Sequence, residues 1–303
     1  AGLISPRSVV RSHFPLPILK GNMFNKDITV VIASFCSSEK IFECLNSVDK
    51  NIKIIVIENS NDHILKEQIL SKYKNVEVIL SDQNLGYGCA NNLGLSKVET
   101  KFALIMNPDV ILKDDAVKNF LKTTKRIPNF GIIAPVSKNE KYQNFNIELD
   151  NELKEVDNVK GFAMFLNIAN LRDLKFFDSN FFLYFEEIDL CKRLRSKNIK
   201  IYIDPTIQTN HLGGASHDKR FNTQMELSRN WHWMWSTFYF HKKHYGYISA
   251  FLNILPKFFL SMIKFLFYLI TLNKIKKNIY KYRLLGIVNS ILLKKSSYRP
   301  NIQ

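Results

Sequence analysis

The sequence predicts an α/β fold in which a mostly parallel sheet is flanked by helices, followed by a helical C-terminal extension. Between residues 28 and 203, short apolar runs rich in β-branched residues alternate with segments of helical periodicity. This alternation is typical of parallel sheets whose two faces are covered by helices. After residue 226 the alternation stops, and aromatic, basic and long apolar segments replace it.

Six apolar runs are expected to form strands. They span residues 28–34, 52–57, 76–80, 102–106, 159–166 and 199–203. Their shortness and β-branched content favour buried strands over helices. Four helices are expected between them, and their apolar positions are Ile41, Leu45 and Val48; Ile64, Ile69 and Leu70; Val117, Phe120 and Leu121; and Ile188, Cys191 and Leu194. The pattern weakens from residue 130 to 160, and no further element is predicted there.

The composition is that of a globular protein with one large domain and an appendage. The chain has 303 residues, of which 46% are apolar and 23% charged. Its four cysteines form no CxxC pair, which favours core positions in a reducing compartment. Residues 1–22 do not resemble a secretory signal, and we interpret them as a leader or an added extension outside the fold. The predicted organisation is a domain over residues 23–226 and a tail over residues 227–303.

The tail is basic and partly very apolar. Thirteen Lys or Arg and no Asp or Glu follow Glu226, so the tail holds most of the net charge of +16. Either nucleic acid or an anionic membrane would attract this charge. The run over residues 247–272 is long enough to cross a bilayer, but Lys257, Lys264 and Pro256 lie inside it. We favour a helix in the membrane plane, flanked by interfacial tryptophans, over a spanning helix or a packing helix.

Polar residues follow four of the predicted strands at the point where each strand ends. They are Ser34, Glu58, Asn84 and Asp109. Ligands of parallel sheets bind at these carboxyl ends, so the repetition predicts a binding site there. Asp109 follows an apolar strand and a proline, and it is either a turn residue or a ligand for a hard cation such as Mg²⁺ or Mn²⁺.

A second acidic group opens the helix after the aromatic run at residues 181–185. Glu186, Glu187 and Asp189 either interact with the helix dipole or provide a catalytic base. Apolar neighbours and mutual repulsion are expected to raise a carboxyl pKa here, as a general base requires. Asp189 and Arg193 are spaced i,i+4 and are expected to form a structural pair.

Six landmarks occur in a fixed order along the chain: Val30–Phe35, Ile57–Ser60, Asn84–Asn92, Asn107–Asp109, Phe177–Asp178 with Phe182–Leu190, and His211. In this order they resemble the inverting family 2 glycosyltransferases of the GT-A fold, near the bacterial rhamnosyltransferase-like branch. The resemblance covers roughly residues 27–245. It implies a Rossmann-like, mostly parallel sheet.

The resemblance implies a role for each motif residue. Nucleotide-sugar binding is implied for Ala33, Ser34, Phe35, Glu58, Asn84, Gly86, Asn92, Asn107 and Asp109. A divalent metal, Mg²⁺ or Mn²⁺, is implied at Asp109 and His211. The catalytic base is implied at Glu187, with Glu186 as the alternative. The chain departs from the family pattern at Asn107, where the first acid of an Asp-x-Asp motif is usual, and at Glu58, where Asp is usual.

The implied protein is a metal-dependent, inverting hexosyltransferase of polysaccharide and cell-envelope biosynthesis. Its donor would be a nucleoside-diphosphate sugar, with rhamnose suggested by the branch. Its acceptor would be a lipid-linked saccharide or surface glycan. The tail would hold it on the cytoplasmic face of the bacterial inner membrane, and no nucleic acid is expected as a partner.

Two other functions are weighed against this one. A sugar nucleotidyltransferase would be expected to carry a glycine-rich basic loop after the first strand, and residues 33–38 contain neither Gly nor Arg. A non-catalytic glycan- or nucleic-acid-binding protein would account for the basic tail, but no recognition motif for nucleic acid occurs in the sequence.

Overall fold

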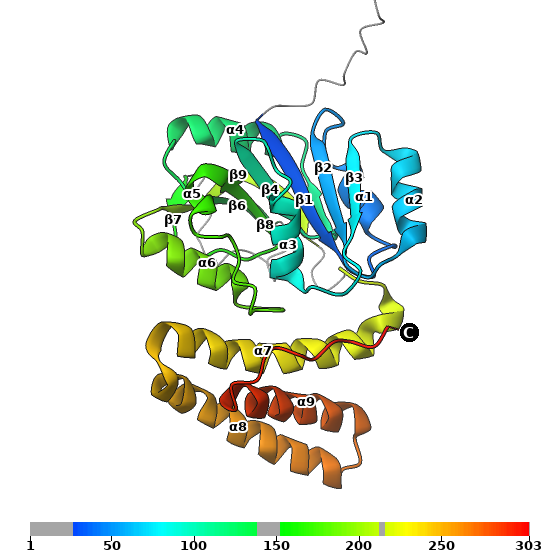
Figure 1. Ribbon diagram of the computed structural model, residues 1–303, viewed down its shortest axis with the longest axis vertical. Coiled ribbons are helices and arrows are strands. Elements are labelled where there is room, and N and C mark those ends of the chain that lie inside the picture. The colour runs from blue at the N-terminus through cyan, green and yellow to red at the C-terminus, as the bar shows by residue number, and fades with distance from the viewer. Residues whose placement is uncertain (1–26, 138–151, 212–215, 303) are drawn as a thin grey trace, which may run out of the picture.

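The structure is a computed structural model that describes residues 27–137, 152–211 and 216–302. The residues interpreted as a leader therefore lie outside the described part of the chain. A sheet-based unit and a three-helix unit lie against each other, and one long helix of the three-helix unit faces the sheet-based unit (Figure 1).

Nine strands of the described residues form one mixed sheet in the order β3-β2-β1-β4-β8-β6-β9-β5, and β7 pairs with β9. The first four strands in this order are parallel, β8 is antiparallel to β4 and β6, and β6 and β9 are parallel. The strands are β1 (Ile28–Ser34), β2 (Lys53–Glu58), β3 (Val76–Leu80), β4 (Phe102–Met106), β5 (Val110–Leu112), β6 (Ile132–Ser137), β7 (Lys154–Glu155), β8 (Ala163–Asn167) and β9 (Ile201–His211).

Helices cover both faces of the sheet because successive strand residues point to opposite sides. In β1, Val30 and Ile32 pack into one core cluster and Val31 into the other. The first cluster lies under α1, α2 and α4, and the second under α3 and α6. The helices of this unit are α1 (Ile41–Asn46), α2 (His63–Lys72), α3 (Tyr87–Leu95), α4 (Ala116–Arg126), α5 (Ile168–Arg172) and α6 (Glu186–Arg195).

The predicted α/β architecture is confirmed, with differences in individual elements. β1 to β4 agree with the predicted runs to within one residue, but β8 begins four residues later than predicted. β9 continues past Pro205 to His211. It stays paired with β6 over this length because the pairing register shifts between Pro135 and Val136. β5, β6 and α3 were not predicted. α3 forms despite two glycines, and Gly94 allows it to pack so closely on β1 that an added Cβ would lie 2.4 Å from Val31.

The three-helix unit consists of α7 (Asn222–Tyr245), α8 (Tyr247–Ile270) and α9 (Lys274–Ile291). Met234 and Phe238 of α7 pack against Ala250, Ile254 and Ile287. α9 rests directly on the backbone of α7 at Gly286, where an added Cβ would lie 2.3 Å from the Trp231 carbonyl oxygen. The predicted domain boundary at residue 226 falls inside α7, which contacts both units.

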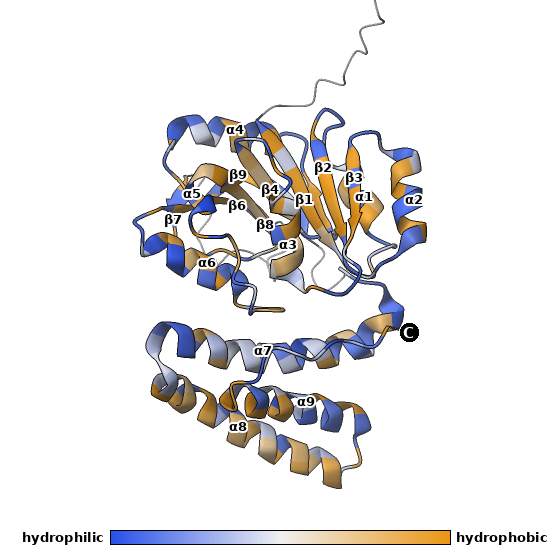
Figure 2. Cartoon of the chain, in the orientation of Figure 1, coloured by the Kyte–Doolittle hydropathy of each residue, from blue (hydrophilic) through white to orange (hydrophobic). Residues whose placement is uncertain are grey.

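α8 is the predicted apolar helix (Figure 2), and many of its apolar side chains are exposed. It is the one helix among the described residues that is long and apolar enough to cross a membrane, and 17% of its most apolar window is buried. Two of the tryptophans expected at a membrane interface are instead in the interior: Trp231 and Trp235 are 3% and 4% exposed, whereas Trp233 is 42% exposed. They are buried because α7 packs against both units.

Candidate active site

A cavity of about 180 Å³ lies at the carboxyl ends of β1, β2 and β4. This is the edge of the sheet where the sequence predicted ligand binding. Five of the predicted residues line it: Ala33, Phe35, Asn84, Gly86 and Asn107. Other parts of its wall come from residues that were not predicted: Asn59, Tyr87, Pro108, Phe182, Leu183, Ser216, His217, Met225, Ser228, Arg229 and Pro300.

The turn before α3 forms one wall of the cavity. The Asn84 side-chain oxygen accepts hydrogen bonds from the Gly86 amide at 3.0 Å and from the Asn59 side chain at 3.1 Å. Gly86 has a φ of +81°, and an added Cβ would lie 2.3 Å from the Phe182 carbonyl oxygen. Only glycine satisfies both constraints, so this turn and the Phe182 backbone fit together through the absence of a side chain.

Four predicted nucleotide-binding residues do not line the cavity: Asp109, described below, and Ser34, Glu58 and Asn92. Ser34 is fully buried in β1. The Glu58 carboxylate accepts hydrogen bonds from the Ser60 amide and hydroxyl and from the Asp62 amide, so it fixes the turn that carries Asn59. The Asn92 side chain bonds both backbone groups of Phe177 and ties α3 to that loop. Ligand contacts by Ser34, Glu58 and Asn92 stay predictions.

Asp109 and His211 lie together because β5 pairs with β9 in the register Val110↔His211. The His211 Nε2 is 3.6 Å from the Asp109 Oδ1. His211 is the last residue of β9 rather than a loop residue, and its ring stacks on Phe162 at 4.7 Å. Asp109 is 2% exposed, and neither of its carboxylate oxygens has a hydrogen-bond partner among the described residues.

This pair fits a divalent cation. A buried carboxylate without a partner is costly, and a hard cation would neutralise it. The described residues contain no group of three or more His, Cys, Asp or Glu that could hold a metal by itself. The protein would therefore supply two ligands and leave the others to phosphate oxygens and water, as is typical of Mg²⁺ beside a phosphorylated substrate.

Glu186 and Glu187 open α6 in different surroundings. The chain enters the helix through Tyr184 and Phe185, which both have a φ of +69°. Glu186 is 4% exposed, and its Oε2 has no hydrogen-bond partner in the described structure. Glu187 is half-buried beside Gly161 and forms no salt bridge with the described residues.

Both acids hold their protons more strongly than usual. Burial and the neighbouring Glu187 carboxylate raise the pKa of Glu186 well above its ordinary value. Burial raises the pKa of Glu187 to about 7. A carboxylate of that pKa is half ionised near neutrality and accepts a proton readily, so Glu187 is suited to act as a general base.

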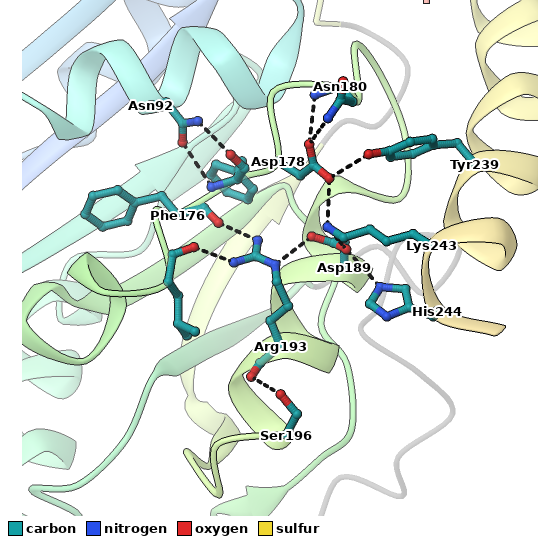
Figure 3. Close-up of polar contacts among 12 residues, drawn as sticks. Asn92, Phe176, Asp178, Asn180, Asp189, Arg193, Ser196, Tyr239, Lys243 and His244 are labelled. Carbon is teal, nitrogen blue, oxygen red and sulfur yellow. Dashed lines mark hydrogen bonds and ion pairs between the residues drawn. The ribbon is translucent and has the colours of Figure 1, made fainter. Parts of the chain in front are cut away.

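A charged network joins α6 to α7 (Figure 3). The buried Asp189 carboxylate lies 2.7 Å from Arg193 Nε, 2.6 Å from Lys243 Nζ and 2.9 Å from His244 Nε2. Lys243 also lies 2.7 Å from Asp178. The predicted pairing of Asp189 with Arg193 is confirmed, and the additional partners from α7 fasten the helix that carries Glu187.

Comparisons with known proteins identify the family of the chain. The family model for Glycosyl transferase family 2 matches residues 29–189, more than half of the chain. The chain therefore belongs to glycosyltransferase family 2, as its six landmarks predicted.

Two relatives are glycosyltransferases by name. The low-salt glycan biosynthesis hexosyltransferase Agl10 of Haloferax volcanii is 25% identical over 58% of this chain and 64% of its own length. The rhamnosyltransferase WbbL of Escherichia coli is 26% identical over 60% of this chain and 80% of its own length. The chain thus spans just under two thirds of Agl10, and the similarity to WbbL agrees with the branch that the landmarks resemble.

Solved structures confirm the GT-A fold. The mannosyltransferase PcManGT from Pyrobaculum calidifontis, solved with GDP-Man and Mn²⁺, aligns over 90% of this chain and 89% of its own, with a TM-score of 0.57 and 11% identity. GalNAc-T7, solved with UDP, GalNAc and Mn²⁺, aligns over 61% of this chain and 43% of its own, with a TM-score of 0.53 and 12% identity. At these identities the likeness concerns the fold alone.

Proposed function

We propose that this protein is a metal-dependent, inverting glycosyltransferase that moves a sugar from a nucleoside-diphosphate donor to a hydroxyl of a lipid-linked saccharide or surface glycan. The observation that carries the proposal is the buried Asp109 carboxylate, which lies at the carboxyl edge of the sheet beside His211 and has no hydrogen-bond partner among the described residues. Glu187, whose pKa is raised to about 7 and which forms no salt bridge with the described residues, supports it. The name of the WbbL relative favours rhamnose as the sugar.

The chemistry follows from the two acids. The donor would occupy the cavity, with Asp109 and His211 holding the cation that compensates the charge of its diphosphate. Glu187 would remove the proton from the acceptor hydroxyl, whose oxygen attacks the anomeric carbon from the face opposite the diphosphate. The bond to the diphosphate breaks as the new glycosidic bond forms, so the configuration inverts once. Mn²⁺ in both solved structures supports a divalent cation.

The donor test is a thermal-shift screen with UDP-, dTDP- and GDP-sugars, each with and without Mg²⁺ or Mn²⁺. We expect one nucleotide class to raise the Tm in a metal-dependent way, and Asp109→Asn to abolish the metal dependence. Asp115→Asn, at an exposed acid before α4, is the matched control. No stabilisation of the folded wild-type protein by any donor would contradict the proposal.

We also propose that α8 places the enzyme on an anionic membrane, at the cytoplasmic face of the inner membrane. The exposed apolar side chains of α8 form one continuous face, and they include Leu252, Phe259, Leu260, Ile263, Leu266 and Phe267. Its two lysines do not interrupt that face, since Lys257 bonds Asn253 and Lys264 lies over the Tyr280 ring of α9. Apolar area beside basic residues is what an interfacial helix requires.

Liposome sedimentation tests this placement. The double variant Leu260→Glu with Ile263→Glu should no longer pellet with vesicles containing anionic lipid, because two charges enter the face that would be buried. Ile64→Glu changes a residue on α2 that is at least as exposed, and this variant should pellet like the wild type. Unchanged pelleting of the double variant would contradict the placement.

A further inference from the structure

Arg229 is the only Lys or Arg among the described residues that line the cavity. It lies on α7, nearly 200 residues after the first cavity residue in the sequence, so its position depends on the packing of α7 against the sheet-based unit. It forms no salt bridge with a carboxylate of the described residues. An arginine that faces a cavity without a counter-charge from the protein is suited to bind an anion.

His217 fixes the direction of this guanidinium. The Arg229 Nη2 lies 3.2 Å from His217 Nδ1, and the His217 Nε2 lies 3.1 Å from the Asn222 side-chain oxygen. Arginine only donates hydrogen bonds, so Nδ1 must accept and Nε2 must carry the proton that is donated to Asn222. Burial and the Arg229 charge lower the pKa of His217, so the imidazole stays neutral and keeps its acceptor.

With a single acid at the metal position, a cation is held by fewer charges, and a positive side chain of the protein would add to the stabilisation of a diphosphate. The chain has one acid, Asp109, where the resembled motif has two, since Asn107 replaces the other. A nucleoside diphosphate gains negative charge as it leaves, and preorganised cations stabilise that charge best. Arginine matches two phosphate oxygens at once through its planar fork.

We propose that Arg229 binds the phosphates of the donor and that His217 is the positioning residue that aims it. This inference rests on the proposed function, because it names the residue that holds the leaving group of that reaction. The probe is a pair of ligands that differ only in phosphate: UDP, dTDP or GDP against uridine, thymidine or guanosine.

Isothermal titration of each pair tests the inference. Arg229→Gln should weaken nucleoside-diphosphate binding by about 10- to 100-fold, the usual value of a hydrogen bond to a charged group, and leave nucleoside binding unchanged. Arg220→Gln, at a 72% exposed arginine in the 3₁₀ helix η2 (Lys219–Phe221), is the matched control and should bind like the wild type. His217→Leu should weaken diphosphate binding, and His217→Gln should restore part of it because its side-chain oxygen accepts from Arg229.

The outcomes separate this inference from the proposed function. If folded Arg229→Gln binds the nucleoside diphosphate as tightly as the wild type, Arg229 has no phosphate role. If the wild type binds neither member of any pair, the proposed function fails and the inference with it. If His217→Leu behaves like the wild type, Arg229 binds phosphate without help from His217.

A different observation supports a second inference, which concerns the segment after α9. Residues 294–302 run back along α7 toward the cavity (Figure 1). The Trp235 indole donates to the Lys294 carbonyl at 2.9 Å. His232 donates from Nε2 to the Tyr298 carbonyl at 2.9 Å, and its Nδ1 lies 3.0 Å from the Ser296 hydroxyl. The side chains of Trp235 and His232 on α7 and of Ser296 in the segment therefore fix the path of the segment.

The segment ends its path against the cavity wall. The Arg299 guanidinium carbon lies 3.7 Å from the centroid of the Phe182 ring, and Pro300 is buried and lines the cavity. The same ring lies 4.4 Å from the His232 ring and directly against Gly86. Phe182 is thus enclosed by three elements that are far apart in the sequence.

We infer that Arg299 positions Phe182 as a wall of the donor site, so the segment after α9 completes the cavity. Arg299 acts on the shape of the wall and Arg229 on phosphate, and the same titrations distinguish them. Arg299→Ala should weaken the nucleoside and the nucleoside diphosphate alike, by about 3- to 10-fold for a lost cation–π contact. Arg299→Lys should restore part of the loss, and Lys295→Ala, an exposed neighbour, should have no effect. Wild-type affinities in folded Arg299→Ala would overturn the inference.

Discussion

The acids of α6 fall into two groups with opposite surroundings. At the α6–α7 interface, Asp189 is paired with Arg193, Lys243 and His244 (Figure 3). One turn earlier, Glu186 is similarly buried but keeps a carboxylate oxygen without a hydrogen-bond partner, and Glu187 has no salt bridge with the described residues. Buried carboxylates are normally neutralised, so the first group fixes the helix and the second is available for chemistry.

The largest effect, a loss of transfer activity, is expected from substitution of Glu187. Glu187→Gln keeps the size of the side chain but cannot accept a proton, so kcat should fall by about 10²- to 10⁴-fold. Donor affinity measured by titration should not change. Glu67→Gln, at an exposed acid on α2, is the control. Transfer at the wild-type rate by folded Glu187→Gln would remove Glu187 from the mechanism and return the role of base to Glu186.

The pH dependence of transfer should report the same group. Glu187 acts only when ionised, and its pKa is raised to about 7. The rate should therefore be constant above that pH and fall about tenfold per pH unit below it. Initial rates between pH 5 and 9 measure the profile, with stability checked at each pH. A midpoint near 4.5, the ordinary value for Glu, would show that burial does not control the base.

Substitution of the paired acid, Asp189, should lower the stability of the protein rather than the rate of transfer. Asp189→Asn leaves Arg193, Lys243 and His244 facing a neutral side chain, and the free energy of unfolding should fall by about 3 kcal/mol. The matched control is Asp157→Asn, which removes an exposed partner of Arg195 on the same helix and should cost well under 1 kcal/mol. Urea unfolding measures both. Equal losses in the two variants would contradict the comparison.

The smallest expected effect is a gain in stability when Glu186 is replaced by Gln. The pKa of Glu186 is higher in the folded than in the unfolded protein, so the folded state binds more protons and loses stability as the pH rises above the ordinary pKa. Glu186→Gln removes this penalty and should raise the Tm by about 2–4 °C at pH 8, the equivalent of about 1 kcal/mol for a protein of this size. Near pH 4 the two proteins should melt together. A lower Tm at pH 8 would show that the Glu186 carboxylate is stabilising.

The first four strands could be predicted because each is a short run of mostly apolar residues. β6 could not, since Pro135 lies inside it and its place is decided by pairing with β9. The sequence of α3 has little apolar periodicity, and its helix depends on close packing of Gly94 against β1. These elements are determined by tertiary contacts that no local pattern records.

The acidic residues of the candidate site could be predicted from the sequence, but many residues that line the cavity could not. Asp109 and Glu187 stand at abrupt changes from apolar to acidic sequence, and such edges are visible along the chain. Arg229 and Pro300 belong to segments whose composition resembles a basic membrane tail, and only the packing of α7 brings them to the cavity. The side chains of Glu58 and Asn92 bond the backbone of Asp62 and Phe177, contacts that the sequence did not predict, and their binding to the nucleotide stays a prediction.

The close contact of α9 with α7 at Gly286 has a consequence for the height of the reaction above a bilayer. With α8 on the membrane, as proposed, α7 and α9 stand between the lipid and the sheet-based unit. Each packed helix layer adds about 8–10 Å. The three-helix unit then acts as a spacer of fixed thickness, and an acceptor reaches Glu187 only if its saccharide extends beyond that layer. A membrane-anchored acceptor would thus be selected by its length as well as by its chemistry.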